Sequence, residues 1–233
     1  MKRIVATIVC AGILLLSGAA GAATISTLPS WDGSLSIGAM GEPNSATYGQ
    51  TFRITPGMDN RLTSATFYVN DLRNPDAVDF AFYVYQWTGT RITGNALYAS
   101  SMVTTQGSAG FEAISFNNIN VDLTPGDYVA FGSASNFFDG ITGQSEWGIT
   151  GDDSAYADGT FVFMNNGSDF NMLFTNDWET TADFLPTDLA FTIELGRGAP
   201  PTAVPEPSIP LLGGVVLVWI GLSKLRVCNR MTL

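Results

Sequence analysis

The chain of 233 residues contains no histidine, and its two cysteines, Cys10 and Cys228, lie close to its ends. Without histidine there can be no Ser-His-Asp triad, no Cys-His dyad and no zinc site of the Cys/His kind. A domain formed by the residues between the two cysteines has no disulfide bond, and a domain of that size does not require one. These absences exclude several common classes of hydrolase before any motif is considered.

Positive charge is also scarce away from the ends. Only five of the ten basic residues, all of them arginines, fall between residues 23 and 203, together with twenty of the twenty-one acidic residues, which gives this region a net charge of about −15. Because such a surface repels polyanions, we expect no nucleic-acid partner. The acids are scattered singly between apolar runs, which favours a folded acidic surface over a disordered acidic tail.

The N-terminus has the three parts of a secretory signal peptide. Lys2 and Arg3 precede an apolar stretch from Ile4 to Leu16, and the small residues SGAAGAA follow. The apolar stretch is too short to span a bilayer comfortably. The A-x-A pattern that ends at Ala22 predicts cleavage there, so that residues 1–22 are removed on export.

A second apolar run lies near the C-terminus, from Ile209 to Leu222. It is shorter than the roughly twenty residues of a stable spanning helix, so we predict a sorting helix over residues 209–223 that stays in the membrane only transiently. Basic residues favour the cytoplasmic side, which makes residues 224–233 a cytoplasmic tail. The residues that stop transfer there are Lys224, Arg226 and Arg230.

A short motif of proline and glutamate precedes this helix. Its residues are Val204, Pro205, Glu206, Pro207 and Ser208, and residues 198–208 form a proline-rich linker. In its order of motif, short helix and basic tail, the C-terminus resembles the PEP-CTERM sorting signal of exported bacterial proteins. The resemblance implies processing by an exosortase, in a Gram-negative-type bacterium that makes exopolysaccharide. It also implies a membrane-anchored precursor and a mature protein at the cell surface, in the outer membrane or in the extracellular matrix.

Between the ends, short runs rich in β-branched and aromatic residues recur about every ten residues, separated by Gly, Pro, Asn and Asp. No helical apolar period competes with them, so we predict a single antiparallel β-sandwich over residues 23–197. The chain from Tyr48 to Leu195 is also similar to the jelly-roll-like domain common among PEP-CTERM proteins, through motifs such as GQTFRI, LTPGDYVAF and DLAFTIEL. The expected strands are 46–55, 62–71, 78–87, 97–105, 111–121, 127–135, 160–166 and 189–195.

The strand at 78–87 carries large side chains on both faces. Phe80 and Phe82 point to one side, and Tyr83 and Tyr85 to the other. A strand with two such faces is expected in the centre of a sheet. The segment WTGTR that follows predicts a tight hairpin, with Gly89 in a conformation of positive φ.

Long polar loops between Ser133 and Asp188 offer oxygen ligands, which is what Ca²⁺ requires. The candidate ligands are Asp152, Asp153 and Asp158 in GDDSAYADG, and Asp169 in NNGSDFN. Neither loop fits the EF-hand pattern, so ordinary solvated loops remain the alternative to a calcium site.

Two tryptophans, Trp147 and Trp178, fall in or beside these loops. Exposed aromatic faces stack on sugars, which makes the two side chains candidates for a carbohydrate site; a role in the core is the alternative.

The favoured function is that of a non-catalytic protein of the cell surface or of the exopolysaccharide matrix, sorted by an exosortase. The alternative is a carbohydrate-binding module with a defined sugar site. The calcium site considered above would make its sugar binding calcium-dependent. Twenty scattered acids make paired carboxylates unavoidable by chance, and no motif surrounds any pair, so we predict no enzymatic activity. Extracellular polysaccharide is a candidate partner in both readings, and a defined sugar site is expected in the second alone.

Processing at both ends can be tested on the native protein. Mass spectrometry of the mature surface protein is expected to find no peptide that contains Cys10 or Cys228, and a new N-terminus at Ala23. An intact C-terminus on the surface protein would contradict the sorting prediction and leave the export prediction standing.

Overall fold

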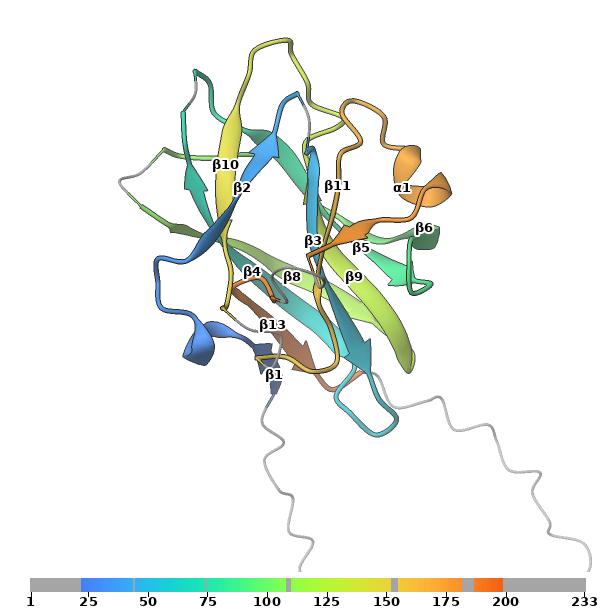
Figure 1. The fold of residues 1–233 in the computed structure, drawn as a ribbon. Coiled ribbons are helices and arrows are strands. Elements are labelled where there is room, and N and C mark those ends of the chain that lie inside the picture. Colours follow the sequence, from blue (N-terminus) through green and yellow to red (C-terminus); the bar gives the residue numbers. More distant parts are fainter. Residues whose placement is uncertain are drawn as a thin grey trace, which may run out of the picture. The chain divides into compact units, whose positions relative to one another are not determined.

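The computed structural model describes residues 22–43, 45–73, 75–107, 110–151, 155–181 and 187–198. They form two antiparallel sheets packed face to face (Figure 1), which confirms the predicted all-β sandwich. Within these ranges no helix is long and apolar enough to cross a membrane. The predicted signal peptide, the linker with its PEP motif, the sorting helix and the basic tail lie outside the described residues, apart from residues 22 and 198.

The long strand β4 (Arg61–Asp71) organises the first sheet. β8 pairs along one edge of β4, while β13 and β10 follow one another along its other edge. β1 and β2 then pair with β13 and β10. The bounds of these strands are β1 Ala23–Ser26, β2 Ser36–Gly41, β8 Glu112–Asp122, β10 Gln144–Gly148 and β13 Phe191–Gly196.

The second sheet has the order β12-β11-β3-β9-β5-β6, with β7 paired to the start of β5. The expected strand at 78–87 is β5, which has partners on both sides, as predicted. Gly89 in the following hairpin has a φ of 104°. The bounds are β3 Thr47–Ile54, β5 Asp79–Trp87, β6 Ile92–Ala99, β7 Val103–Thr104, β9 Gly126–Ser133, β11 Phe161–Met164 and β12 Glu179–Thr180.

The sequence pattern missed four strands, β1, β2, β10 and β12, and joined β6 and β7 into one. β10 lies in a stretch predicted to be loop. Its sequence, QSEWG, has a single large apolar residue and turns polar side chains to solvent, so that its hydrophobic pattern is too short to read. Its place in the sheet is fixed by pairing with β2 and β4, which are far from it along the chain.

Aromatic rings fill the space between the two sheets. Trp147, on β10, has its ring centroid 5.3 Å from that of Phe67 and 5.8 Å from that of Phe80. Phe82 stacks on Phe116 with 4.4 Å between centroids. Inward side chains of both sheets therefore interlock in one core, as expected of a sandwich.

The opposite face of the second sheet is buried as well. A segment that contains the short helix α1 (Met172–Thr175) covers β5 and β9 there, and Leu173 and Trp178 pack against Tyr85 and Phe131. Both faces of β5 are thus covered, which explains why both carry large side chains.

A buried polar contact ties the second sheet to the segment that leads into β13. Asp188 is fully buried, and its carboxylate accepts hydrogen bonds from Gln50 Nε2 (2.7 Å) and from the amide of Tyr156 (2.9 Å). Gln50 in turn accepts one from the amide of Leu189 (2.8 Å). Buried polar groups that are satisfied in this way fix the alignment of the elements that they join.

Removal of the Trp147 side chain tests how much the core between the sheets contributes to the stability of the domain. Trp147→Ala is expected to lower the free energy of unfolding by about 3–5 kcal/mol, because it removes a large side chain that is 1% exposed and leaves a cavity. Met102→Ala, at a side chain 51% exposed, is the control and should change it by less than about 0.5 kcal/mol. Urea unfolding followed by circular dichroism measures both, and equal values for the two variants would contradict the assignment of the core.

Candidate functional site

The two tryptophans predicted to bind sugar are buried. Trp147 is 1% exposed between the sheets, and Trp178 is 6% exposed under the α1 segment, where its Nε1 donates to the carbonyl of Leu173 (3.0 Å). Neither indole can offer a face to a sugar ring, so the prediction for these two residues is wrong. The alternative reading, a role in the core, holds for both. Both indoles are buried by apolar packing, although the sequence around them is polar and was predicted to form loops.

The two predicted calcium ligands that the structure describes, Asp158 and Asp169, do not come together. Asp152 and Asp153 lie outside the described residues. Asp158 lies near the end of β3, where its charge acts on Arg53. Asp169 lies near the start of β3, because its carbonyl accepts a hydrogen bond from Asn166, and Asn166 accepts one from the hydroxyl of Thr47. A strand rises about 3.3 Å per residue, so Asp158 and Asp169 are on the order of 20 Å apart and cannot share an ion.

Acidic side chains also line a hollow formed by the loops at one end of the sandwich: Glu42, Asp76, Asp79 and Asp139. Glu42, Asp76 and Asp139 accept hydrogen bonds from loop amides; the Glu42 carboxylate, for instance, accepts from the amides of Asp139 (3.1 Å) and Gly140 (3.0 Å). Asp79, at the start of β5, accepts from the hydroxyl of Thr104 on β7. In the part of the chain that the structure describes, no three Asp, Glu, Cys or His side chains are grouped so as to hold a metal ion. These carboxylates serve to shape the loops.

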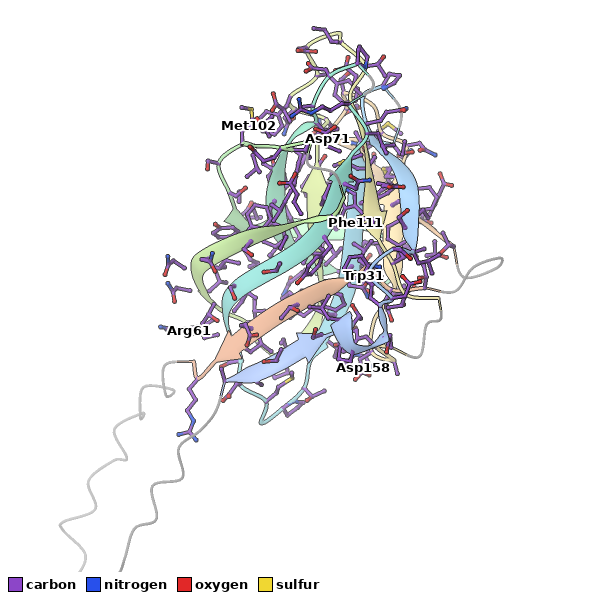
Figure 2. The ribbon with its side chains drawn as sticks, turned by 90° about the vertical axis from the view of Figure 1, so that its left-hand side faces the viewer. Trp31, Arg61, Asp71, Met102, Phe111 and Asp158 are labelled. Atoms are coloured by element: carbon purple, nitrogen blue, oxygen red, sulfur yellow. The ribbon has the colours of Figure 1, made fainter. Side chains whose placement is uncertain are left out.

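The outer face of the first sheet carries a cluster of aromatic rings, which we call the aromatic platform: Trp31, Tyr68 and Phe111. The centroid of the Trp31 ring lies 5.0 Å from that of Tyr68 and 5.1 Å from that of Phe111. All three side chains are partly exposed. Figure 2, which looks onto this face, shows Trp31 and Phe111 near one another in front of the strands.

Trp31 rests on the seam where β10 and β13 meet along β4. The amide of Ala190 donates to the carbonyl of Gly148 across this seam (2.6 Å). A Cβ atom at Gly148 would lie only 2.7 Å from Cζ2 of Trp31, so the indole packs directly against the backbone there. The lack of a side chain at Gly148 makes room for the ring.

The loop before β2 holds the indole in place. Trp31 Nε1 donates to the carbonyl of Leu35 (2.9 Å), and Asp32 Oδ1 accepts from the amides of Leu35 (2.7 Å) and Ser34 (2.8 Å). These backbone hydrogen bonds, Leu35 first, lower the pKa of the Asp32 carboxyl from its ordinary value of 3.8. Because the pKa of Asp32 is lower in the folded state, these hydrogen bonds stabilise the fold fully at any pH above the ordinary pKa. This stabilisation is lost as the pH falls through the lowered pKa.

Hydrogen-bonding side chains surround the platform. Along β4 and β8, Thr66 and Ser115 are bonded through their hydroxyls (2.9 Å). Towards the other end of β4, Glu146 accepts from Asn70 Nδ2 (2.7 Å) and from the hydroxyl of Ser36 (2.7 Å). The outer face therefore combines a small apolar surface with neighbouring hydroxyl, amide and carboxylate groups, which is a surface suited to a ligand with both apolar and polar faces.

The sequence analysis missed this site because its three rings come from distant segments. Tyr68 and Phe111 lie in expected strands, and alternation with the buried Phe67 and Ile114 places both on the outer face. Trp31 precedes every strand that the pattern predicted, and no local feature indicates that its loop crosses the sheet.

No protein-family model matches the sequence, and no curated protein is significantly similar to it. Among solved structures, the chain resembles the cysteine protease and lectin-like domains of Cwp84, a surface layer associated protein of Clostridium difficile, with a TM-score of 0.43 and 11% identity over 66% of this chain and 33% of that one. The clostridial cysteine protease Cwp84 after propeptide cleavage gives a TM-score of 0.44 and 10% identity, over 70% and 38% of the two chains. The chain thus spans little more than a third of the length of these structures, and similarity of this degree carries no argument about function.

The seat of the indole can be tested with glycine variants. Gly148→Ala should displace Trp31, because the added Cβ would stand 2.7 Å from its ring, and should shift the indole N–H resonance of Trp31 in the NMR spectrum. Gly151→Ala is the matched control, since its nearest neighbour, Leu35 Cδ2, is 3.6 Å away in ordinary contact. A Trp31 resonance that is unchanged in Gly148→Ala would contradict the packing described here.

Proposed function

We propose that the protein is an exported, non-catalytic protein that binds a neutral polysaccharide on the outer face of its first sheet. The aromatic platform carries this proposal. Sugar rings have apolar C–H faces that pack on aromatic rings, and hydroxyl groups that bond polar side chains at their edges. The platform offers the rings of Trp31 and Tyr68, with Thr66, Ser115 and Asn70 on the strands beside them.

Charge favours a neutral ligand over an acidic one. Four arginines are occupied in ion pairs with aspartates: Arg53 with Asp127, Arg61 with Asp122, Arg73 with Asp71 and Arg91 with Asp177. The many remaining acids keep the surface negative, and Asp32 and Glu146 lie next to the platform. An anionic polysaccharide would be repelled from such a face, whereas a neutral one would not.

The ends of the chain supply the cellular context of the proposal. The signal peptide and the resemblance to PEP-CTERM proteins support export and sorting by an exosortase, which would deliver the domain to the cell surface or to the extracellular matrix. Polysaccharide binding without turnover would then hold the protein within the exopolysaccharide. The absence of histidine from the whole sequence and the structural use of the loop carboxylates support a non-catalytic role.

The proposal is tested by affinity electrophoresis of the processed protein in gels that contain neutral polysaccharides. Trp31→Ala and Tyr68→Ala are each expected to weaken binding at least about tenfold, equivalent to ~1.4 kcal/mol, because each removes one stacking surface. Leu97→Ala is the control, since Leu97 is 36% exposed on β6 in the other sheet. Thermal melting of each variant establishes that it is folded.

Three results would contradict parts of the proposal. Binding that is equal in all variants would exclude the aromatic platform, and no binding to any neutral polysaccharide would leave a matrix protein without sugar recognition. New reducing ends after incubation with a polysaccharide would contradict the non-catalytic assignment.

A further inference from the structure

A second binding site can be located at an open edge of the sandwich. β2 is the last strand of the first sheet on this side, and β11 and β12 are the last strands of the second. Between them lies a cleft of about 410 Å³, which falls within the roughly 300–1,000 Å³ of small-molecule sites. Its described lining consists of Ile37, Gly38, Ser45, Tyr48, Phe163 and Asn165, with Thr181 at the end of β12.

The described lining of this cleft has aromatic walls and uncharged polar groups, and Asn165 Nδ2 donates to the carboxylate of Glu179 on the neighbouring β12 (3.5 Å). Tyr48 and Phe163 face one another, with 6.2 Å between ring centroids. Burial raises the pKa of Tyr48 to about 12, so its phenol stays neutral. Ser45 donates its hydroxyl to Asn165 Oδ1, which holds the amide of Asn165 at the rim. The described lining thus pairs apolar rings with hydroxyl and amide groups.

Thr181 provides an independent indication of a ligand. Its side chain is 1% exposed and lines the cleft, yet among the described residues its hydroxyl has no hydrogen-bond partner. A buried polar group without a partner is unfavourable. Among the described residues the Thr181 hydroxyl shares this state with Nε1 of Trp147, which lies in the core between the sheets. A ligand hydroxyl in the cleft would satisfy the hydroxyl of Thr181.

We propose that this cleft binds a single neutral sugar ring, separately from the aromatic platform. The choice of a sugar rests on the proposed function, while the position rests on the cleft alone. The ring would place an apolar face against Phe163 and bring its hydroxyls to Thr181 and Asn165. A closed-in site of this kind suits one ring at a chain end or branch, whereas the platform lies on an open sheet face and suits the interior of a chain.

The test is an NMR titration of the ¹⁵N-labelled processed protein with methyl α-D-glucopyranoside, methyl α-D-mannopyranoside and methyl β-D-galactopyranoside. At least one is expected to shift the backbone amides of Ser45, Phe163 and Thr181. Thr181→Val should weaken that binding about two- to tenfold, since it removes one hydrogen bond of ordinary net strength. Because it also removes an unsatisfied buried hydroxyl, the melting temperature of the free variant should be unchanged or higher.

Thr180→Val is the matched control. Thr180 directly precedes Thr181 and is the last residue of β12. It pairs with Val162, whose side chain belongs to the cluster on the opposite face of the second sheet, and alternation points Thr180 to that face. It should bind as the unmodified protein does. If no glycoside shifts the cleft amides, or if Thr181→Val binds as Thr180→Val does, the cleft proposal is overturned.

The platform and the cleft can fail separately. Polysaccharide binding that depends on Trp31, with no response in the cleft, would leave the proposed function standing and remove this inference. Glycoside binding that depends on Thr181, with no effect of Trp31→Ala on polysaccharide binding, would support the cleft and contradict the aromatic platform.

Discussion

The domain depends on the layer of aromatic side chains between its two sheets. No cysteine lies within the described residues, so no disulfide bond restrains them, and burial has to supply most of the stability. Trp147 stands in the middle of this layer and contacts rings from both sheets, Phe67 on β4 and Tyr48 on β3. Because its ring points inward, its neighbour Gly148 faces outward, and that small outward position is where Trp31 rests.

The two sheets differ in what covers their outer faces. The second sheet is covered by the α1 segment, which buries the side chains of Tyr85, Phe131 and Val162 on its outer face. On the outer face of the first sheet, the described residues place the loop of Trp31 over the seam, with Tyr68 and Phe111 beside it and polar side chains such as Thr66, Ser115 and Asn70 around them. This asymmetry leaves one sheet with exposed rings among hydrogen-bonding groups, and it is the reason that the candidate site lies there.

Acidic residues serve the fold in several places outside the predicted calcium ligands. Glu42, Asp76 and Asp139 accept backbone hydrogen bonds in loops, Asp32 shapes the turn that holds Trp31, and Asp188 is buried in a polar contact with Gln50. Loops that are oxygen-rich in sequence need those oxygens for their own amides. What remains of the acidic surface acts through its overall sign, which disfavours anionic ligands.

The sequence alone determined the class of the fold, because strand propensity and two-residue alternation are local. It identified most of the strands, the double-sided character of β5 and the hairpin at Gly89, since each of these depends on residues that are near neighbours in the chain. It did not reveal β10, because that strand is too short to show a pattern and is defined by its pairing with β2 and β4. It also did not reveal the burial of Trp147 and Trp178. The aromatic platform and the cleft were decided by tertiary structure, because Trp31, Tyr68 and Phe111, like Tyr48, Phe163 and Thr181, meet only when strands from distant segments pair. The packing of whole sheet faces determines which strands pair, and no single stretch of the sequence contains that information.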